Sequence, residues 1–212
     1  MDWLNRFRRE TLTLAFHLFY NQLAWTYDVV SWAISRGRWS VWQRAALPRL
    51  RGKRVLEVAF GTGNLLLELI AEGYETYGLD LSRSMIRIAI HKLRRHQVSA
   101  SLSCGRVQAL PFPDQCFDSI VVTFPAPFIH KIAALRQMWR TLTPEGRLVI
   151  VDGAVFHSGG FLSTLINFAF RFSGTGQGLA RRMALLEEVG FSVKEEWARD
   201  DISAVKVMVA EK

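Results

Sequence analysis

From residue 54 onward the sequence alternates short apolar runs with helical patterns, and this alternation limits the possible fold more than any other feature. Strands are expected at 54–59, 76–80, 100–104, 118–123 and 147–152, and helices at 64–72, 82–96 and about 130–142. Repeated β-α units with such short connections build a parallel sheet with helices on both faces. After a helix at 177–189, residues 191–198 and 203–210 are expected to form an antiparallel pair of strands. We therefore predict a Rossmann-like α/β fold with a mostly parallel, seven-stranded sheet.

The first 48 residues have a different pattern and are expected to form an N-terminal helical extension in front of a main domain at 49–212. Apolar residues recur at roughly helical spacing over 3–34, and a short helix is expected at 39–46. The stretch 11–34 lacks Lys and Arg, but its polar residues favour a helix that lies in a membrane interface over one that crosses the bilayer. A plain helical cover over a binding pocket explains the same pattern equally well.

The strongest candidate site is the turn that follows the first strand. Its sequence is Val55-Leu56-Glu57-Val58-Ala59-Phe60-Gly61-Thr62-Gly63-Asn64, in which a buried strand delivers an acid and then a glycine turn into a helix. Gly61 and Gly63 can adopt backbone angles closed to other residues, so that a ligand can lie against the main chain and the free amides of the helix. Because tight β-α turns also use glycine for structural reasons, this turn is not specific by itself.

Asp80 supplies the second half of this candidate site. It ends the second strand and lies seventeen positions after Gly63. A carboxylate at this place can accept two hydrogen bonds from the ribose hydroxyls of an adenosine ligand, although it could instead cap the helix that follows. Enzymes that bind NAD usually carry a third glycine where this chain has Leu66, and the sequence therefore favours another nucleoside.

Four signatures in the same order make the chain resemble the class I S-adenosylmethionine-dependent methyltransferases over roughly residues 50–212. They are Leu56-Glu57-Val58-Ala59-Phe60-Gly61-Thr62-Gly63; Gly78-Leu79-Asp80-Leu81-Ser82 with Met85; Ala109-Leu110-Pro111-Phe112-Pro113 with Phe117-Asp118; and Leu142-Thr143-Pro144-Glu145-Gly146-Arg147-Leu148. Within this superfamily the chain is most similar to the ubiquinone/menaquinone-biosynthesis branch, including the element Trp25-Thr26-Tyr27-Asp28. The resemblance implies S-adenosylmethionine as the cofactor and methyl transfer as the reaction.

The resemblance also implies roles for individual residues. The methionine part of the cofactor would be surrounded by Glu57, Ala59, Phe60, Gly61 and Gly63. Asp80 would hold the ribose, Leu81 and Met85 would border the adenine together with Arg106 and Val107, Thr123 would face the methyl group, and Tyr27 would close the pocket.

Two of these positions depart from the family pattern. Ala59 replaces the usual first glycine and fits only if its backbone angles are ordinary. Arg106 replaces an aspartate that commonly accepts from the adenine amino group, which a guanidinium cannot do, so a backbone carbonyl would have to substitute.

Methyl transfer from a sulfonium needs alignment more than covalent catalysis, so the lack of a catalytic triad does not argue against an enzyme. If a general base takes part, His130 is the first candidate, followed by Asp152 and His157. No metal site is expected, because Cys104 and Cys116 match neither a metal clamp nor a disulfide framework. The same cysteine usage favours a cytoplasmic protein.

The positive charge is concentrated in two patches, which favour an anionic partner unless they are ordinary solvated helix faces. Residues 1–54 contain ten Lys and Arg against three acids, and 83–95 contain five and no acid. The first hypothesis is a small apolar or lipid-like acceptor (a quinol, a phenol or a phospholipid headgroup), handled by a peripheral protein on an anionic membrane surface. The apolar segment 161–172 would then form a lid. RNA methylation is the weaker alternative, and a catalytically inactive binding protein is the third.

Overall fold

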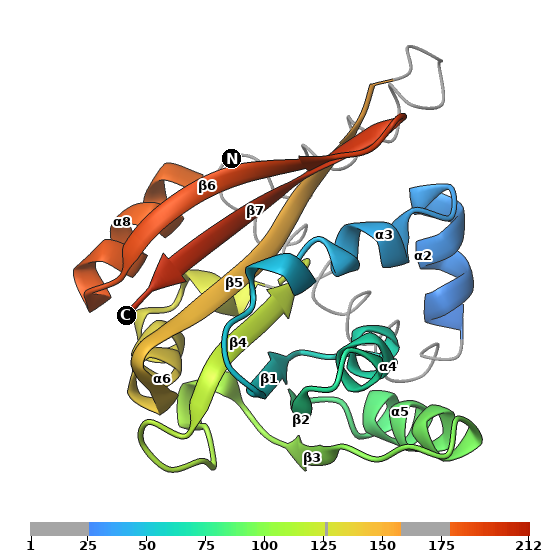
Figure 1. The fold of residues 1–212 in the computed structure, drawn as a ribbon, viewed down its shortest axis with the longest axis horizontal. Coiled ribbons are helices and arrows are strands. Elements are labelled where there is room, and N and C mark those ends of the chain that lie inside the picture. Colours follow the sequence, from blue (N-terminus) through green and yellow to red (C-terminus); the bar gives the residue numbers. More distant parts are fainter. Residues whose placement is uncertain (1–25, 126, 158–178) are drawn as a thin grey trace, which may run out of the picture.

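The computed structural model of the protein describes residues 26–125, 127–157 and 179–212 (Figure 1). The expectations for residues 3–25 and for the segment 161–172 lie outside these ranges. The helices are α2 (Tyr27–Ser35), α3 (Trp39–Arg44), α4 (Asn64–Ala71), α5 (Arg83–Arg95), α6 (Ile132–Thr141) and α8 (Leu179–Val189). Short 3-10 turns are η2 (Leu47–Arg49), η3 (Val107–Ala109) and η4 (Pro127–His130). No helix in the described ranges is long and apolar enough to span a membrane.

Seven strands form one sheet in the order β3-β2-β1-β4-β5-β7-β6. They are β1 (Arg54–Val58), β2 (Glu75–Asp80), β3 (Ser101–Cys104), β4 (Phe117–Thr123), β5 (Leu142–Phe156), β6 (Ser192–Arg199) and β7 (Ser203–Glu211). All neighbouring pairs are parallel except the two that involve β7. The predicted fold class is therefore confirmed, including the antiparallel pair at the end of the chain.

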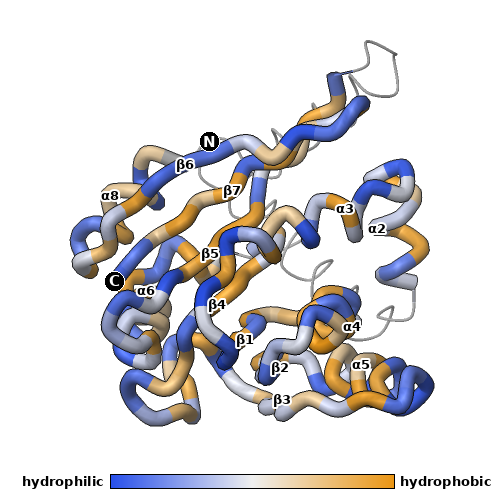
Figure 2. Tube along the Cα trace, viewed as in Figure 1, coloured by the Kyte–Doolittle hydropathy of each residue, from blue (hydrophilic) through white to orange (hydrophobic). Residues whose placement is uncertain are grey.

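Strand β5 is longer than the 147–152 expected from its apolar run. It continues to Phe156 because β7 pairs with it beyond the main sheet, where Val155 lies opposite Ala204 and Phe156 opposite Ser203. The edge strand β6 is largely hydrophilic and alternates in exposure, whereas β4, β5 and β7 are apolar (Figure 2). A strand at the edge of a sheet has one neighbour only, so fewer of its side chains are buried.

The two faces of the sheet carry separate apolar cores. On one face, α3 and α4 pack on Val55 and Val121, and on the other, α6 and α8 pack on Leu56 and Ile120. This arrangement follows from the burial of parallel strands on both faces. Trp42 of α3 is 1% exposed and its Nε1 donates to Ser203 Oγ at 2.9 Å, so α3 is anchored to the sheet. The division of the chain at residue 48 stays a prediction.

The direction of the sheet order reverses between β1 and β4, since β2 and β3 lie on one side and β5 to β6 on the other. In open α/β sheets a ligand usually binds at such a reversal, outside the carboxyl ends of the strands. The glycine turn after β1 and the segment after β4 both begin at this edge. The fold thus brings the candidate residues of the sequence to one place.

Candidate active site

The glycine turn and the acid of β2 are joined directly. Asp80 Oδ2 accepts a hydrogen bond from the Gly61 amide at 2.9 Å, and its Oδ1 accepts from the Ser82 amide at 2.8 Å. Gly61 has a φ of 58° and Gly63 a φ of 79°, in the left-handed region that favours glycine. A Cβ on Gly63 would lie 2.9 Å from that of Ala89, whereas a Cβ on Gly61 would meet nothing within 4 Å. The open space lies at Gly61, where a ligand can approach the main chain.

Ala59 does not meet the condition that its backbone be ordinary. Its φ is 58°, in the left-handed region, and its amide donates to Leu79 O at 2.7 Å, which holds it in place. The turn requires a positive φ at this position, and the glycine that the family usually has here would adopt it without a steric penalty. A Cβ in this conformation costs roughly 1–2 kcal/mol.

We therefore expect Ala59→Gly to stabilise the protein by about 0.5–1 kcal/mol. The relief of the Cβ strain is partly offset by the larger entropy of glycine in the unfolded chain. Urea unfolding followed by circular dichroism measures the change. Ala184→Gly, at an exposed position in the interior of α8, is the control and should destabilise by about 1 kcal/mol. A loss of stability in Ala59→Gly would contradict the strain argument.

Glu57 and Asp80 form a buried acidic pair beside this turn. Glu57 is 1% exposed, and its Oε2 has no hydrogen-bond partner among the described residues. Burial, followed by the nearby Asp80 charge, raises the pKa of Glu57 well above its usual value. Burial also raises the pKa of Asp80, although the amides of Ser82 and Gly61 oppose that shift. A buried acceptor without a donor fits the ammonium group of an amino-acid ligand.

Residues expected around the adenine follow the carboxyl ends of the neighbouring strands β2 and β3. Leu81 is 61% exposed and follows Asp80 directly, whereas Met85, in the first turn of α5, is fully buried and Val107 is 5% exposed. Arg106 is exposed. Exposure of Leu81 next to the buried carboxylate of Asp80 offers an apolar surface beside the place where the sequence predicts a ribose. The individual adenine contacts stay predictions.

A clamp that the sequence reading missed ties α2 to the glycine turn. Asp28 Oδ1 accepts from Thr62 Oγ1 at 2.6 Å and from Asn64 Nδ2 at 3.0 Å, and its Oδ2 accepts from Lys92 Nζ at 2.9 Å. Lys92 also donates to Asn64 Oδ1 at 2.5 Å. The signal was an acid inside the aromatic element before the domain, but its partners lie 34 to 64 positions away. Tyr27, its neighbour, makes an edge-to-face contact with Trp39 with ring centroids 6.2 Å apart.

Removal of this clamp by Asp28→Ala is expected to destabilise the protein by about 1–2 kcal/mol at neutral pH. This value is smaller than for a fully buried carboxylate, because water partly screens the side chain of Asp28. Burial raises the pKa of Asp28, but the hydrogen bonds from Thr62, Lys92 and Asn64 and the charge of Lys92 together outweigh it. The net pKa therefore lies below the usual 3.8. The contribution is therefore complete above 3.8 and is lost as the pH falls through the lower, folded-state pKa.

Thermal unfolding at several pH values tests this expectation. The stability difference between the wild type and Asp28→Ala should shrink below pH 3.8. Asp201→Ala, which removes an exposed acid, serves as the control for net charge. An unchanged difference down to low pH would show that the clamp does not hold an ionised carboxylate.

The carboxyl end of β4 is covered by α3. Thr123 Oγ1 accepts from Gln43 Nε2 at 3.1 Å, and Phe124 stacks on Trp39 with ring centroids 4.3 Å apart. Sequence reasoning did not predict Gln43, which is buried and whose Oε1 lacks a partner among the described residues. These contacts place Thr123 under an aromatic cover at the edge where the sheet order reverses.

Of the three candidate bases, the structure brings His130 and Asp152 together. The charge of Asp152 raises the pKa of His130, and the charge of His130 lowers the pKa of Asp152. Asp152 also forms a buried ion pair with Arg182, with 2.7 Å between Oδ2 and Nη1. Burial, and then the charges of Arg182 and Arg181, lower the pKa of His130. His157 is exposed, and its amide pairs with Ile202 O beyond the main sheet.

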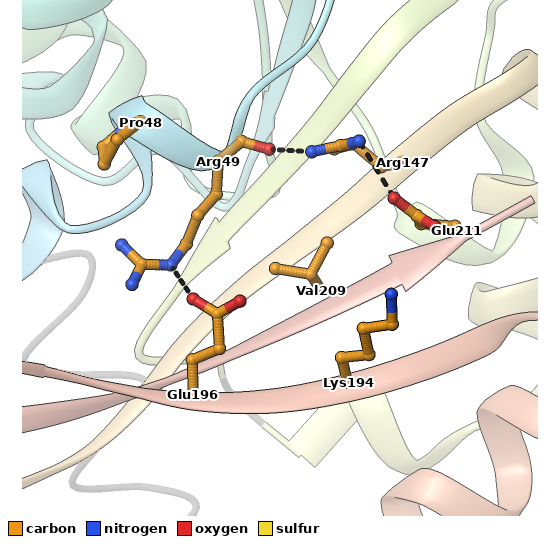
Figure 3. A pocket seen from close by; sticks show the side chains of 7 residues that line it. All are labelled: Pro48, Arg49, Arg147, Lys194, Glu196, Val209 and Glu211. Carbon is orange, nitrogen blue, oxygen red and sulfur yellow. Dashed lines mark hydrogen bonds and ion pairs between the residues drawn. The ribbon is translucent and has the colours of Figure 1, made fainter.

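A separate charged pocket of about 420 Å³ lies on the outer part of the sheet (Figure 3). Arg49 pairs with Glu196 and Arg147 with Glu211, each at 2.9 Å, and Lys194 and Val209 complete the lining with Pro48 (Figure 3). Arg147 lies opposite Ser119 of β4, near the amino ends of the parallel strands. The pocket is therefore at the opposite end from the glycine turn and is not the candidate site.

The strand order, with the glycine turn after β1 and the acid at the end of β2, defines an α/β domain with the class I methyltransferase fold. Residues 55–146 match the methyltransferase domain family. A putative S-adenosylmethionine-dependent methyltransferase from Methanococcus maripaludis has the same fold, with a TM-score of 0.65, 19% identity, and coverage of 89% of this chain and 93% of the other. A Haemonchus contortus phosphoethanolamine N-methyltransferase, solved with S-adenosylhomocysteine, gives a TM-score of 0.62 at 16% identity, over 83% of this chain and 53% of the other.

Sequence similarity is higher to one branch of these proteins. The ubiquinone/menaquinone biosynthesis C-methyltransferase UbiE of Yersinia enterocolitica is 34% identical over 142 residues, which are 63% of this chain and 57% of the relative. The matching part thus spans less than three fifths of the length of that relative. These findings confirm the predicted resemblance to class I S-adenosylmethionine-dependent methyltransferases and to the ubiquinone/menaquinone branch, and they support S-adenosylmethionine as the cofactor.

Proposed function

We propose that the protein transfers the methyl group of S-adenosylmethionine to a small apolar or lipid-like acceptor, such as a quinol, a phenol or a phospholipid headgroup. The observation that carries the proposal is the joined site at the sheet reversal, where Asp80 accepts from Gly61 beside the unpartnered Oε2 of Glu57. Glu57 would hold the methionine ammonium, Asp80 the ribose, and Thr123 would lie near the methyl group. The cofactor, when bound, supplies a methyl group that is already activated by the sulfonium charge.

The protein's own task in this reaction is alignment. Holding a nucleophile in line with the methyl group can contribute up to about 7–11 kcal/mol through prepaid entropy. The aromatic cover of Trp39 and Phe124 over the end of β4 would exclude water from the acceptor. His130, whose pKa is lowered by burial, would be neutral at pH 7 and able to accept a proton from the acceptor.

Calorimetric titration of the purified chain with S-adenosylmethionine tests the binding half of the proposal. Production of S-adenosylhomocysteine in the presence of quinols, phenols or aminophospholipids tests the transfer half. Micromolar binding with turnover of one acceptor class supports the proposal, whereas binding without turnover of any class favours the inactive binding protein. Absence of binding would overturn the proposal.

A peripheral position on the cytoplasmic membrane surface is part of the proposal, because an apolar acceptor resides there. Val29 and Trp32 of α2 are each 66% exposed and Ile34 is 44% exposed, an unusual share of apolar surface for one short helix. Sedimentation with anionic liposomes should fall for Val29→Ser/Trp32→Ser and stay unchanged for the control Trp197→Ser. Equal sedimentation of both variants would refute the membrane role of α2.

The RNA alternative gains little support from the part of the first basic patch that the structure describes. Five arginines between residues 38 and 54 each lie within 3.8 Å of a carboxylate: Arg38, Arg44, Arg49, Arg51 and Arg54. In the second patch, Lys92 is engaged by Asp28, whereas four arginines are exposed: Arg83, Arg87, Arg94 and Arg95. Paired cations attract phosphates less than free ones do, because the neighbouring acid offsets their charge.

A further inference from the structure

A polar cluster lies on the α6 and α8 face of the sheet, just beyond the level at which β4 ends. It consists of Asp152 within β5, Arg182 on α8 and His130 in η4. The side chains of Arg182 and Asp152 are 4% and 3% exposed and form the ion pair described above. In the register of the sheet, Val151 lies opposite Thr123, so Asp152 comes one residue beyond the level of Thr123, on the other face of the sheet. The cluster therefore lies at the same end of the sheet as the proposed reaction, on the face opposite α3.

Two buried nitrogen atoms of this cluster have no hydrogen-bond partner among the described residues. They are Arg182 Nε and His130 Nδ1. The Nε of a guanidinium can only donate, whereas a neutral imidazole nitrogen can accept or donate, depending on the tautomer. Buried polar groups in native proteins are generally satisfied, and an unsatisfied pair in one cluster calls for a group that can serve both.

A single chemical group can serve both kinds of atom. An acidic hydroxyl can accept from Arg182 Nε with its oxygen and donate its proton to His130 Nδ1, and once deprotonated it keeps the hydrogen bond from the guanidinium. An ammonium group offers no acceptor and would meet the positive charge of Arg182, with Arg181 also close enough to influence His130. The chemistry of the cluster thus selects oxygen acids over amines.

We propose that Arg182, Asp152 and His130 form the subsite for an acidic oxygen of the methyl acceptor, such as a phenolic or enolic hydroxyl. Arg182 binds the oxygen, Asp152 orients Arg182, and His130 receives the proton. This inference rests on the proposed function and narrows its acceptor class, since it excludes the amine of a phospholipid headgroup. The acceptor then supplies the electron pair for the new bond to the methyl group, and the electrons of the broken sulfur–carbon bond remain on sulfur.

The test uses the full chain with catechol as the acidic acceptor and phosphoethanolamine as the amine. Arg182→Met/Asp152→Leu removes the subsite without leaving an unpaired buried charge. We expect the affinity for S-adenosylmethionine to stay within twofold and the KM for catechol to rise at least tenfold. Arg136→Gln, which removes an exposed charge on α6, should change neither. A KM for catechol that stays within twofold in the double variant overturns the inference.

A second measurement does not need turnover. In the complex with S-adenosylhomocysteine, catechol should shift the ring NMR signals of His130, with the assignment taken from His130→Gln, and the shift should vanish in the double variant. No shift at saturating catechol, or a preference of the wild type for phosphoethanolamine, overturns the subsite but leaves the proposed function standing. Loss of S-adenosylmethionine binding by the wild type would instead overturn the proposed function.

Discussion

Asp80→Ala is expected to lower the affinity for S-adenosylmethionine by at least about 100-fold. In the proposed complex the carboxylate accepts from two ribose hydroxyls, and hydrogen bonds to a charged group are worth about 1.5–3 kcal/mol each. A loss of about 3 kcal/mol or more corresponds to a factor of 100 or more in the dissociation constant. The same change also removes the acceptors of the Gly61 and Ser82 amides, so the turn itself loses its anchor.

Asp80→Asn separates these two effects. The asparagine has one acceptor oxygen and a nearly equal shape, so it can keep one of the two backbone hydrogen bonds but not both. Its loss of affinity should lie between those of the wild type and Asp80→Ala. Calorimetry with S-adenosylmethionine and with S-adenosylhomocysteine measures both variants, after circular dichroism has shown that they are folded. Asp114→Ala, an exposed acid that pairs with Arg140, is the control and should bind like the wild type. A change of less than threefold in Asp80→Ala would refute the ribose role of Asp80.

The alternation of strands and helices was sufficient to predict the sheet, because each element carries its own local pattern. The seven strands and the antiparallel pair follow from such patterns, and the parallel strand order then brings the glycine turn and Asp80 to one edge of the sheet. Strand length was harder to predict. Strand β5 extends to Phe156 because it pairs with β7, which follows only after α8 and β6 in the chain. A local sequence window contains no trace of that pairing.

Contacts between residues far apart in the chain could not be predicted from the sequence for the same reason. The clamp of Asp28 on Thr62 and Lys92 and the pair of Asp152 with Arg182 join residues that are 30 to 64 positions apart. The backbone of Ala59 shows a different difficulty. Its residue type suggested ordinary angles, but the turn imposes a positive φ whatever the side chain. The conformation there is set by the geometry of the turn and the hydrogen bond to Leu79.

The buried ion pair has the largest expected effect on stability. Arg182→Met should destabilise the protein by about 3–5 kcal/mol, because it leaves the buried Asp152 without its cation. Burial already raises the pKa of Asp152 even with Arg182 present. A raised carboxylate pKa means that the folded state binds the proton more tightly, so this group's contribution to stability is largest at low pH and is lost as the pH rises from 3.8 through the folded-state pKa. The penalty in Arg182→Met should therefore diminish under acidic conditions, where Asp152 becomes protonated.

The double variant Arg182→Met/Asp152→Leu distinguishes a role of the ion pair in stability from a role in binding the acceptor. When both charges are replaced by apolar groups of similar volume, the desolvation cost disappears together with the attraction, and stability is expected within about 1 kcal/mol of the wild type or above it. Urea unfolding of the wild type, the single variant and the double variant forms the comparison. A large loss in the double variant would mean that the pair contributes mainly to stability. Recovery of stability together with a raised KM for catechol would mean instead that the fold tolerates a costly buried pair because the pair and His130 bind the acceptor.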